Sequence, residues 1–230
     1  MSLDNKKWSD KLISKIDPGF KHRWEIYNDI VSKNLTQDTV WVDCGCGNDL
    51  MIEEYGYLTK LAVGIDMLVP KVCKGEFIKA DIKYLPLQTT SVDLLTLRFV
   101  VEHFRCAEPY ISEMERVLKS KGHIIIITTN LQSPIIQIPR LLPANVKSKL
   151  MNILFKVSEK EIFPAYHKLN TRHKFQKLSK RFQIKYFTYI SDLNFIRRWI
   201  FIILIIFHII TKNKFLQKFR SNLMVVLQKD

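Results

Sequence analysis

Short, continuous apolar runs recur through the first 130 residues of the chain. None of them alternates with polar residues, as expected of strands that are covered on both faces. Segments with helical spacing fill most of the gaps between the runs, notably Pro109–Leu118. Alternating strands and helices predict a parallel sheet with right-handed crossovers. The five runs are Val40–Asp43, Leu61–Asp66, Phe77–Ala80, Val92–Leu97 and His123–Thr128.

Helical spacing also dominates both ends of the chain. Residues 8–35 are predicted to form two helices, because Asp17-Pro18-Gly19 interrupts the pattern. An apolar face over residues 146–157 predicts an amphipathic helix, and a basic helix follows, up to about Arg181. Two further strands and the insertion between them are predicted at Phe182–Tyr189, Asn222–Leu227 and residues 195–220.

The net charge of +14 is distributed unevenly along the chain. Residues 1–130 contain 17 Lys+Arg and 18 Asp+Glu, whereas residues 131–230 contain 19 and 4. The second half is therefore expected to face an anionic partner: nucleic acid, a phosphorylated substrate or an anionic membrane surface. The alternative is a solvated basic face that only keeps the protein soluble.

The four cysteines form neither a metal-site pattern nor a disulfide framework. Cys44 and Cys46 lie close together, but no second close pair completes a zinc site, and we interpret both as packing residues. This cysteine usage predicts a reducing, cytoplasmic environment. The first residues, Met1 to Lys7, lack the apolar core of a signal peptide.

The most informative stretch begins where the first strand ends. Gly45 and Gly47 follow Asp43, and glycine allows both positive φ and the close approach of a ligand to the backbone. A dinucleotide site would have a third glycine at position 50, where this chain has leucine. Asp66 ends the second strand 23 residues after Asp43, an offset at which an acid can accept hydrogen bonds from ribose hydroxyls. Asp81 closes the third strand in the same manner.

Six segments in this order resemble the class I S-adenosylmethionine-dependent methyltransferases. The resemblance covers residues 40–130 well and the C-terminal strand pair more loosely. Many members have a further glycine where this chain has Asp49. The segments are Asp43-Cys44-Gly45-Cys46-Gly47, Gly64-Ile65-Asp66-Met67, Ala80-Asp81-Ile82, Ser91-Val92-Asp93-Leu94-Leu95, Val101-Glu102-His103-Phe104 and Arg116-Val117-Leu118-Lys119-Ser120-Lys121-Gly122-His123.

The resemblance implies S-adenosyl-L-methionine as the cofactor and methyl transfer as the reaction. The first segment would contact the methionine part of the cofactor, the Asp66 segment its ribose and the Asp81 segment its adenine. Arg98 would touch the cofactor or the acceptor, or would form a structural ion pair instead. No metal is implied. The cofactor-binding residues are expected to be Asp43, Gly45, Cys46, Gly47, Asp66, Met67, Asp81, Ile82 and Arg98.

An acceptor that reacts through oxygen would also benefit from a base. We consider His103, His167 and His173 and predict that His103 and His167 are catalytic. His103 follows the fourth strand, at the edge of the sheet where ligands bind, although a capping or packing role is the alternative. His167 lies in the segment Tyr166–Thr171, which resembles a segment of methyltransferases that modify saccharides and lipids; a solvent-facing loop is the alternative.

Together these features predict an α/β fold with a Rossmann-like, doubly wound sheet of about seven strands. The sheet is expected to be mostly parallel, with an antiparallel C-terminal strand and a helical insertion before it. Four parts are predicted: an N-terminal helical cap (1–37), an S-adenosylmethionine-binding core (38–130), a basic helical substrate-side cap (131–181), and a C-terminal strand pair with its apolar and basic insertion (182–230).

Residues 199–210 contain a single polar residue, His208, and are flanked by basic residues on both sides. As a helix this run would be about 18 Å long, too short for a hydrocarbon core of about 30 Å. A segment that docks on an anionic leaflet explains both its length and its basic flanks. A buried core helix, a dimer interface and a lid over the acceptor are the alternatives.

We therefore expect methyl transfer to an amphiphilic, lipid-linked or saccharide acceptor, by a cytoplasmic protein that binds peripherally to the inner face of the membrane. One alternative is a soluble methyltransferase whose basic half binds RNA or a small molecule. RNA is less favoured, because the apolar run lacks aromatic residues interleaved with basic ones. The second alternative is a non-catalytic, cofactor-binding relative at the membrane.

Overall fold

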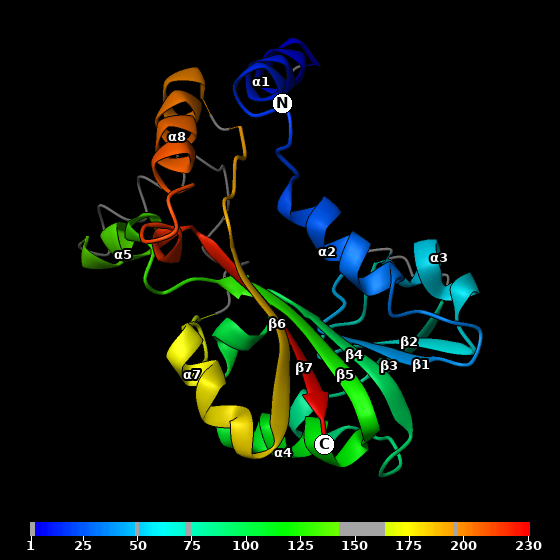
Figure 1. Ribbon diagram of the computed structural model, residues 1–230. Helices are drawn as coiled ribbons and strands as arrows, with labels where there is room; N and C mark the ends of the chain where they lie inside the picture. The colour runs from blue at the N-terminus through cyan, green and yellow to red at the C-terminus, as the bar shows by residue number, and fades with distance from the viewer. Residues whose placement is uncertain (1–2, 49–50, 72–74, 143–163, 196) are drawn as a thin grey trace. The chain divides into compact units, whose positions relative to one another are not determined.

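The computed structural model describes residues 3–48, 51–71, 75–142, 164–195 and 197–230 (Figure 1). The chain forms two compact units, each assembled from three segments. We call the unit of residues 1–26, 130–163 and 189–222 the helical unit, and the unit of residues 27–129, 164–188 and 223–230 the sheet unit.

Seven strands form one sheet in the order β3-β2-β1-β4-β5-β7-β6. β1 pairs in parallel with β2 and β4, β2 with β3, and β4 with β5. The β7 arrow runs opposite to β5 in Figure 1, so the C-terminal strand is antiparallel, and the predicted fold class is confirmed. The strands are β1 (Val40–Cys44), β2 (Leu61–Asp66), β3 (Glu76–Lys79), β4 (Val92–Arg98), β5 (Leu118–Thr129), β6 (Phe182–Ile190) and β7 (Asn222–Lys229).

The central strands are buried because their apolar runs are covered on both faces. Ile124 to Ile127 of β5 are fully buried, and so is Trp41 of β1. α4 covers this core with Ile111, Met114 and Val117. The helices are α1 (Leu3–Ile16), α2 (Arg23–Ser32), α3 (Met51–Tyr55), α4 (Ala107–Val117), α5 (Pro134–Leu141), α7 (Arg172–Gln176) and α8 (Arg198–Ile210), with 3₁₀ turns η1 (Gly56–Leu58), η2 (Ile82–Tyr84), η3 (Val101–His103), η5 (Lys177–Lys180) and η6 (Gln217–Phe219).

β5 begins five residues earlier than its apolar run predicts, at Leu118 rather than His123. Val92 pairs with Leu118, and Leu94 with His123, so β5 bulges between these two pairs. Lys121 has φ +64° at this bulge. Because the residues at the bulge are polar, the pattern of apolar residues does not indicate where this strand begins.

In the helical unit, α1 and α8 share a small apolar core. Its buried members are Ile13, Leu193, Phe201 and Ile205, with Trp8 packed against them. Asp17-Pro18-Gly19 separates α1 from α2, as predicted. The amphipathic helix predicted at residues 146–157 lies outside the described residues. Within the described ranges, no helix is both long enough and apolar enough to cross a bilayer.

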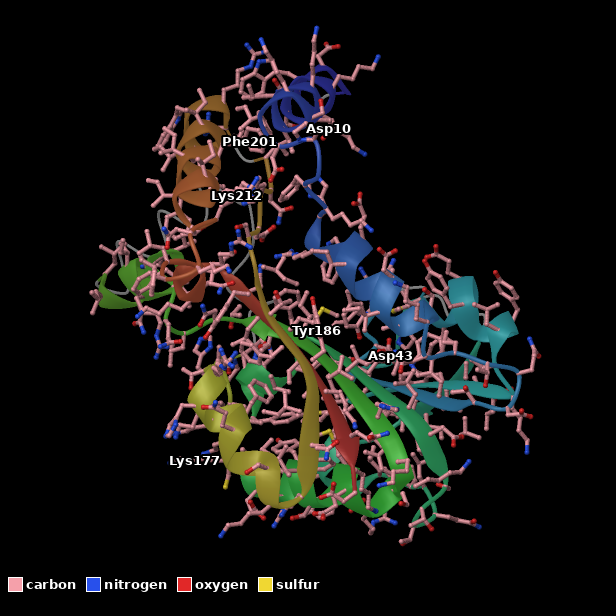
Figure 2. The ribbon with its side chains drawn as sticks, in the orientation of Figure 1. Asp10, Asp43, Lys177, Tyr186, Phe201 and Lys212 are labelled. Atoms are coloured by element: carbon pink, nitrogen blue, oxygen red, sulfur yellow. The ribbon has the colours of Figure 1, made fainter. Side chains whose placement is uncertain are left out.

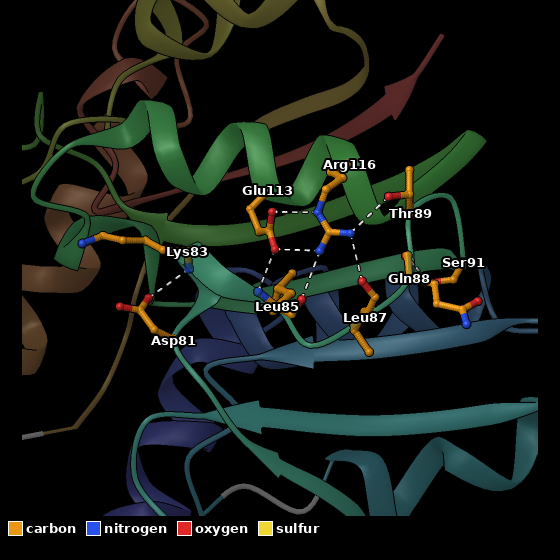
Figure 3. A network of polar contacts seen from close by, with 9 residues as sticks. All are labelled: Asp81, Lys83, Leu85, Leu87, Gln88, Thr89, Ser91, Glu113 and Arg116. Carbon is orange, nitrogen blue, oxygen red and sulfur yellow. Dashed lines mark hydrogen bonds and ion pairs between the residues drawn. The ribbon is translucent and has the colours of Figure 1, made fainter.

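Arg116 and Glu113 of α4 hold the chain between β3 and β4 (Figure 3). The guanidinium donates to the carbonyl oxygens of Leu85 (3.0 Å) and Leu87 (2.9 Å). Glu113 accepts from the Leu85 amide (2.8 Å) and from Arg116 Nη2 (2.7 Å). The hydrogen bond from Arg116 lowers the pKa of Glu113, because it stabilises the charged carboxylate.

This lowered pKa predicts a pH dependence of stability. The stabilisation that the Glu113 carboxylate gives to the folded chain is fully present above the unfolded-state pKa of glutamate, about 4.3. This stabilisation is lost as the pH falls through the folded-state pKa of Glu113. We expect Glu113→Gln to be less stable than the parent chain at pH 7 in urea unfolding. The difference in the free energy of unfolding between the parent chain and Glu113→Gln should narrow steadily below about pH 4. A gap that stayed constant down to pH 2 would contradict this assignment.

Candidate functional site

The loop after β1 takes its shape from two glycines in the left-handed region. Gly45 has φ +72° and Gly47 has φ +57°. A Cβ on Gly45 would lie 2.3 Å from Val100 Cγ2, so a side chain there would clash with the turn after β4. A Cβ on Gly47 would have nothing within 4 Å, so the loop is open at this point. The backbone at Gly47 is therefore accessible to a ligand, as a cofactor-binding loop requires.

Asp66 joins this loop to the end of β2. Its Oδ2 accepts from the Gly47 amide (2.9 Å), and its Oδ1 accepts from the Leu68 amide (2.9 Å). Each carboxylate oxygen can accept more than one hydrogen bond, so both retain capacity for hydroxyl donors. Met67, the next residue, has an exposed side chain. Open backbone beside a fixed carboxylate fits the methionine and ribose parts of S-adenosylmethionine.

Asp81 stands just after the end of β3 and caps η2. Its Oδ1 accepts from the Lys83 amide (3.0 Å), as Figure 3 shows, and Ile82 is buried beside it. The predicted adenine segment is thus a short, fixed turn at the same edge of the sheet as Asp66. The Arg116–Glu113 pair holds the chain that follows this turn.

Asp43, labelled in Figure 2, is 1% exposed and forms a buried polar group with two β4 residues. Its carboxylate accepts from Thr96 Oγ1 (2.6 Å) and from Arg98 Nη2 (3.0 Å). Thr96 Oγ1 in turn accepts from Trp41 Nε1 (2.8 Å). These contacts tie the ends of β1 and β4 together beneath the glycine loop. Arg98 therefore forms the structural ion pair that the sequence analysis offered as one of its possible roles. Contact of Asp43 or Arg98 with the cofactor stays a prediction.

Cys44 and Cys46 are buried residues of this turn, consistent with packing. Burial, together with the nearby Asp43 charge, raises the pKa of the Cys44 thiol, so the thiolate that a metal would need is disfavoured. Within the residues that the structure covers, no cluster of His, Cys, Asp and Glu is arranged to hold a metal ion. Any contact of Cys46 with the cofactor also stays a prediction.

The structure brings His103 and His167 to the carboxyl ends of β4 and β5. His103 Nδ1 lies 3.0 Å from the Pro164 carbonyl oxygen. His167 Nδ1 lies 3.3 Å from Thr129 Oγ1, at the end of β5. His167 has φ +53°, an unusual conformation for a residue other than glycine. His173, the third candidate, lies in α7.

Three buried polar residues that sequence reasoning missed lie behind these histidines. Glu102 accepts from Thr128 Oγ1 (2.6 Å), which in turn accepts from Asn170 Nδ2 (2.7 Å). Asn170 Nδ2 also lies 3.0 Å from Thr129 Oγ1. The amides of Tyr166 and His167 donate to the Glu102 carbonyl oxygen. The network thus fixes residues 166–170 across two strand ends. Its only sequence signal is polar residues directly after apolar runs.

Residues 42–126 match the sequence profile of a methyltransferase domain. An uncharacterised protein of Methanocaldococcus jannaschii is 30% identical over 103 residues, a match that spans 42% of this chain and 44% of that protein. The chain thus matches less than half the length of this curated relative.

Solved structures with the same fold include three that resemble this chain over most of its length. YcgJ of Bacillus subtilis is 13% identical with a TM-score of 0.55, over 90% of this chain and 98% of its own. A SAM-dependent methyltransferase of Methanosarcina mazei is 19% identical with a TM-score of 0.57 (87% and 96%). Geranyl diphosphate C-methyltransferase of Streptomyces coelicolor, solved with S-adenosyl-L-homocysteine, is 12% identical with a TM-score of 0.55 (90% and 78%).

Residues 42–126 therefore resemble a methyltransferase domain, and the sheet has the fold of these solved structures, in agreement with the predicted fold class. S-Adenosyl-L-methionine is the cofactor of this class, and the Gly47–Asp66 geometry fits it.

The buried group around Asp43 predicts a specific stability effect. Thr96→Val should lower the free energy of unfolding by about 2–4 kcal/mol, because it leaves Trp41 Nε1 without the acceptor it has here and removes one of the hydrogen bonds to the buried Asp43 carboxylate. Thr96→Ser keeps the hydroxyl and should cost only about 1 kcal/mol for the lost methyl. Urea unfolding measures both, and equal losses in the two variants would mean that the hydroxyl is not the stabilising group.

Proposed function

We propose that the protein is an S-adenosylmethionine-dependent methyltransferase that methylates an amphiphilic or lipid-linked acceptor at the cytoplasmic face of a membrane. One observation supports the methyltransferase part most strongly. The backbone at Gly47 is open, and its amide donates a hydrogen bond to Asp66 Oδ2 (2.9 Å).

On the donor side, the residues of this chain mainly bind and orient. When bound, S-adenosylmethionine supplies a methyl group on a cationic sulfur with a neutral leaving group. Positioning then provides most of the catalysis. Gly47 would present bare backbone to the methionine part, Asp66 would accept from the ribose hydroxyls, and the Asp81 turn would face the adenine.

On the acceptor side, His167 is the better-placed candidate for a proton acceptor. Its ring is held at Thr129, and its backbone amide is fixed to Glu102. An oxygen acceptor loses a proton as it is methylated, and a positioned histidine is suited to take it. His103 lies on the same strand edge and would line the acceptor region from the side of β4.

The amphiphilic acceptor is supported by composition. Residues 131–230 combine 19 Lys+Arg and 4 Asp+Glu with the apolar helix α8. The Streptomyces coelicolor neighbour was solved with geranyl diphosphate, an anionic head on an apolar chain, so this fold accommodates such a substrate in at least one protein. Basic charge complements the head of such a molecule, and apolar surface complements its tail.

Cofactor binding tests the donor side directly. In calorimetric titration with S-adenosylmethionine, Asp66→Ala should raise Kd at least tenfold, because it removes the ribose acceptor and the partner of the Gly47 amide. Glu76→Ala, at the opposite end of the neighbouring strand, is the matched control and should bind like the parent. Equal affinity of Asp66→Ala and the parent would overturn the proposed cofactor site.

Methyl transfer from radiolabelled S-adenosylmethionine tests the acceptor class. Label should enter the lipid extract of membranes rather than RNA or water-soluble metabolites. With the lipid extract, His167→Gln should lower the rate about 100-fold or more, with an unchanged cofactor Kd, because it removes a general base. Label recovered in RNA, with none in lipid, would replace this acceptor class by the soluble alternative.

A further inference from the structure

Helix α8 of the helical unit has one covered face and one exposed face. Phe201, Ile205 and His208 are buried. Large apolar side chains on the opposite face are 45–61% exposed and follow a spacing of three or four residues, so they form one continuous stripe. We call this stripe the α8 stripe: Trp199, Ile202, Ile203, Ile206, Ile209 and Ile210.

The covered face anchors the helix within its own unit. Phe201 and Ile205 pack in the core that contains Ile13 of α1, and Trp8 contacts the Phe201 ring at a centroid distance of 5.8 Å. At the far end of α8, His208 Nε2 lies 2.9 Å from Asp17 Oδ2, which also pairs with Lys212 at 3.0 Å. Figure 2 labels Phe201 and Lys212 near opposite ends of the helix. The stripe is therefore presented by a helix that is already fixed.

The chain segment that carries the α8 stripe is strongly basic. No acidic residue lies between Asp192 and Asp230, a segment that contains all of α8. A concavity of about 400 Å³ at the start of the helix is lined by apolar, amide and cationic side chains. Its lining residues are Asn5, Phe195, Arg197, Arg198 and Trp199. Beyond the helix, the exposed cations are Lys212, Lys214 and Lys218, and Phe215 among them is 84% exposed.

We infer that the α8 stripe inserts into an anionic phospholipid leaflet, with the helix lying in the plane of the surface. The 13 residues of α8 span about 20 Å, less than the hydrocarbon core of about 30 Å. Apolar residues on one face and cations at both ends are typical of helices at the boundary between headgroups and acyl chains. The concavity with its two arginines is suited to a lipid phosphate, since guanidinium groups bind phosphate well.

Charge and chemistry favour lipid over two other occupants. A two-fold contact between two α8 stripes would bring together the exposed lysines that follow each helix, and like charges repel. Single-stranded nucleic acid would need aromatic platforms among the cations, whereas five of the six stripe residues are isoleucines. The inference rests on the proposed function for its biological meaning, but vesicle binding itself requires neither cofactor nor acceptor.

Flotation with vesicles tests the inference on the full chain. The parent should float with vesicles of phosphatidylcholine and 30 mol% phosphatidylglycerol at low salt, and much less with pure phosphatidylcholine. Ile203→Ser with Ile206→Ser should lower the partition coefficient at least tenfold, because it breaks the middle of the stripe. The matched control, Tyr57→Ser with Leu61→Ser, removes two exposed apolar side chains of the sheet unit and should float like the parent.

The basic flank gives a second, independent readout. Lys214→Gln with Lys218→Gln should weaken binding to the anionic vesicles about fivefold for each lysine, from about 1 kcal/mol per cation near such a surface. The loss should shrink as salt is raised, because salt screens these charges. Calorimetric titration of the same preparations with S-adenosylmethionine shows that each variant is folded, and it separates a failure at the membrane from a failure of the methyl-donor site.

Three results would overturn the inference. The first is a parent chain that stays unbound with anionic vesicles at low salt. The second is flotation that the stripe variant retains in full. The third is a dimer in sedimentation that the stripe variant converts to a monomer, since the second copy would then be the occupant of the stripe.

Discussion

The carboxylate of Asp43 is buried between the ends of β1 and β4, where it accepts hydrogen bonds from Thr96 and Arg98. An ionised group with so little exposure is stable only when such partners satisfy it. Because those partners belong to β4, the group fixes the two central strands relative to each other at the edge where ligands bind. The glycine loop begins at Gly45, directly after the end of β1, so its position depends on this buried group.

The strand ends on the two sides of this buried group carry different residues: β2 and β3 lie beyond β1, and β5 lies beyond β4. Towards β3, an acid at the end of β2 and another just after β3 also organise the local backbone: Asp66 holds the Gly47 loop, and Asp81 caps η2. Towards β5, Arg98 and Thr129 end the two strands, and the Glu102–Thr128–Asn170 network follows them. One edge of one sheet thus provides acceptors for hydroxyl groups on one side and a histidine on the other. Under the proposed function, the first side would bind the methyl donor and the second side the acceptor.

The parts of the site that follow a single strand end could be predicted from sequence. The glycine loop, Asp66 and Asp81 are marked by the transition from an apolar run to a polar residue, which is a local signal. The network behind His167 could not be predicted, because Thr128 and Asn170 lie 26 and 42 residues from their partners. The early start of β5 was missed for a related reason, since pairing with β4 overrides the polar character of Lys119 to Lys121. The apolar run of α8 is evident from its residues, but only packing against α1 decides which face of the helix is covered.

β6 and β7 are neighbours in the sheet, although 31 residues separate the end of one from the start of the other. The chain leaves the sheet at Ile190 and returns beside the same strand at Asn222. A short hairpin could make this connection, so the segment with α8 is topologically an optional module. The proposed methyl-donor side, built from β1 to β3, shares no strand with it. Evolution, or a protein engineer, could therefore exchange or shorten this module without altering β1 to β3.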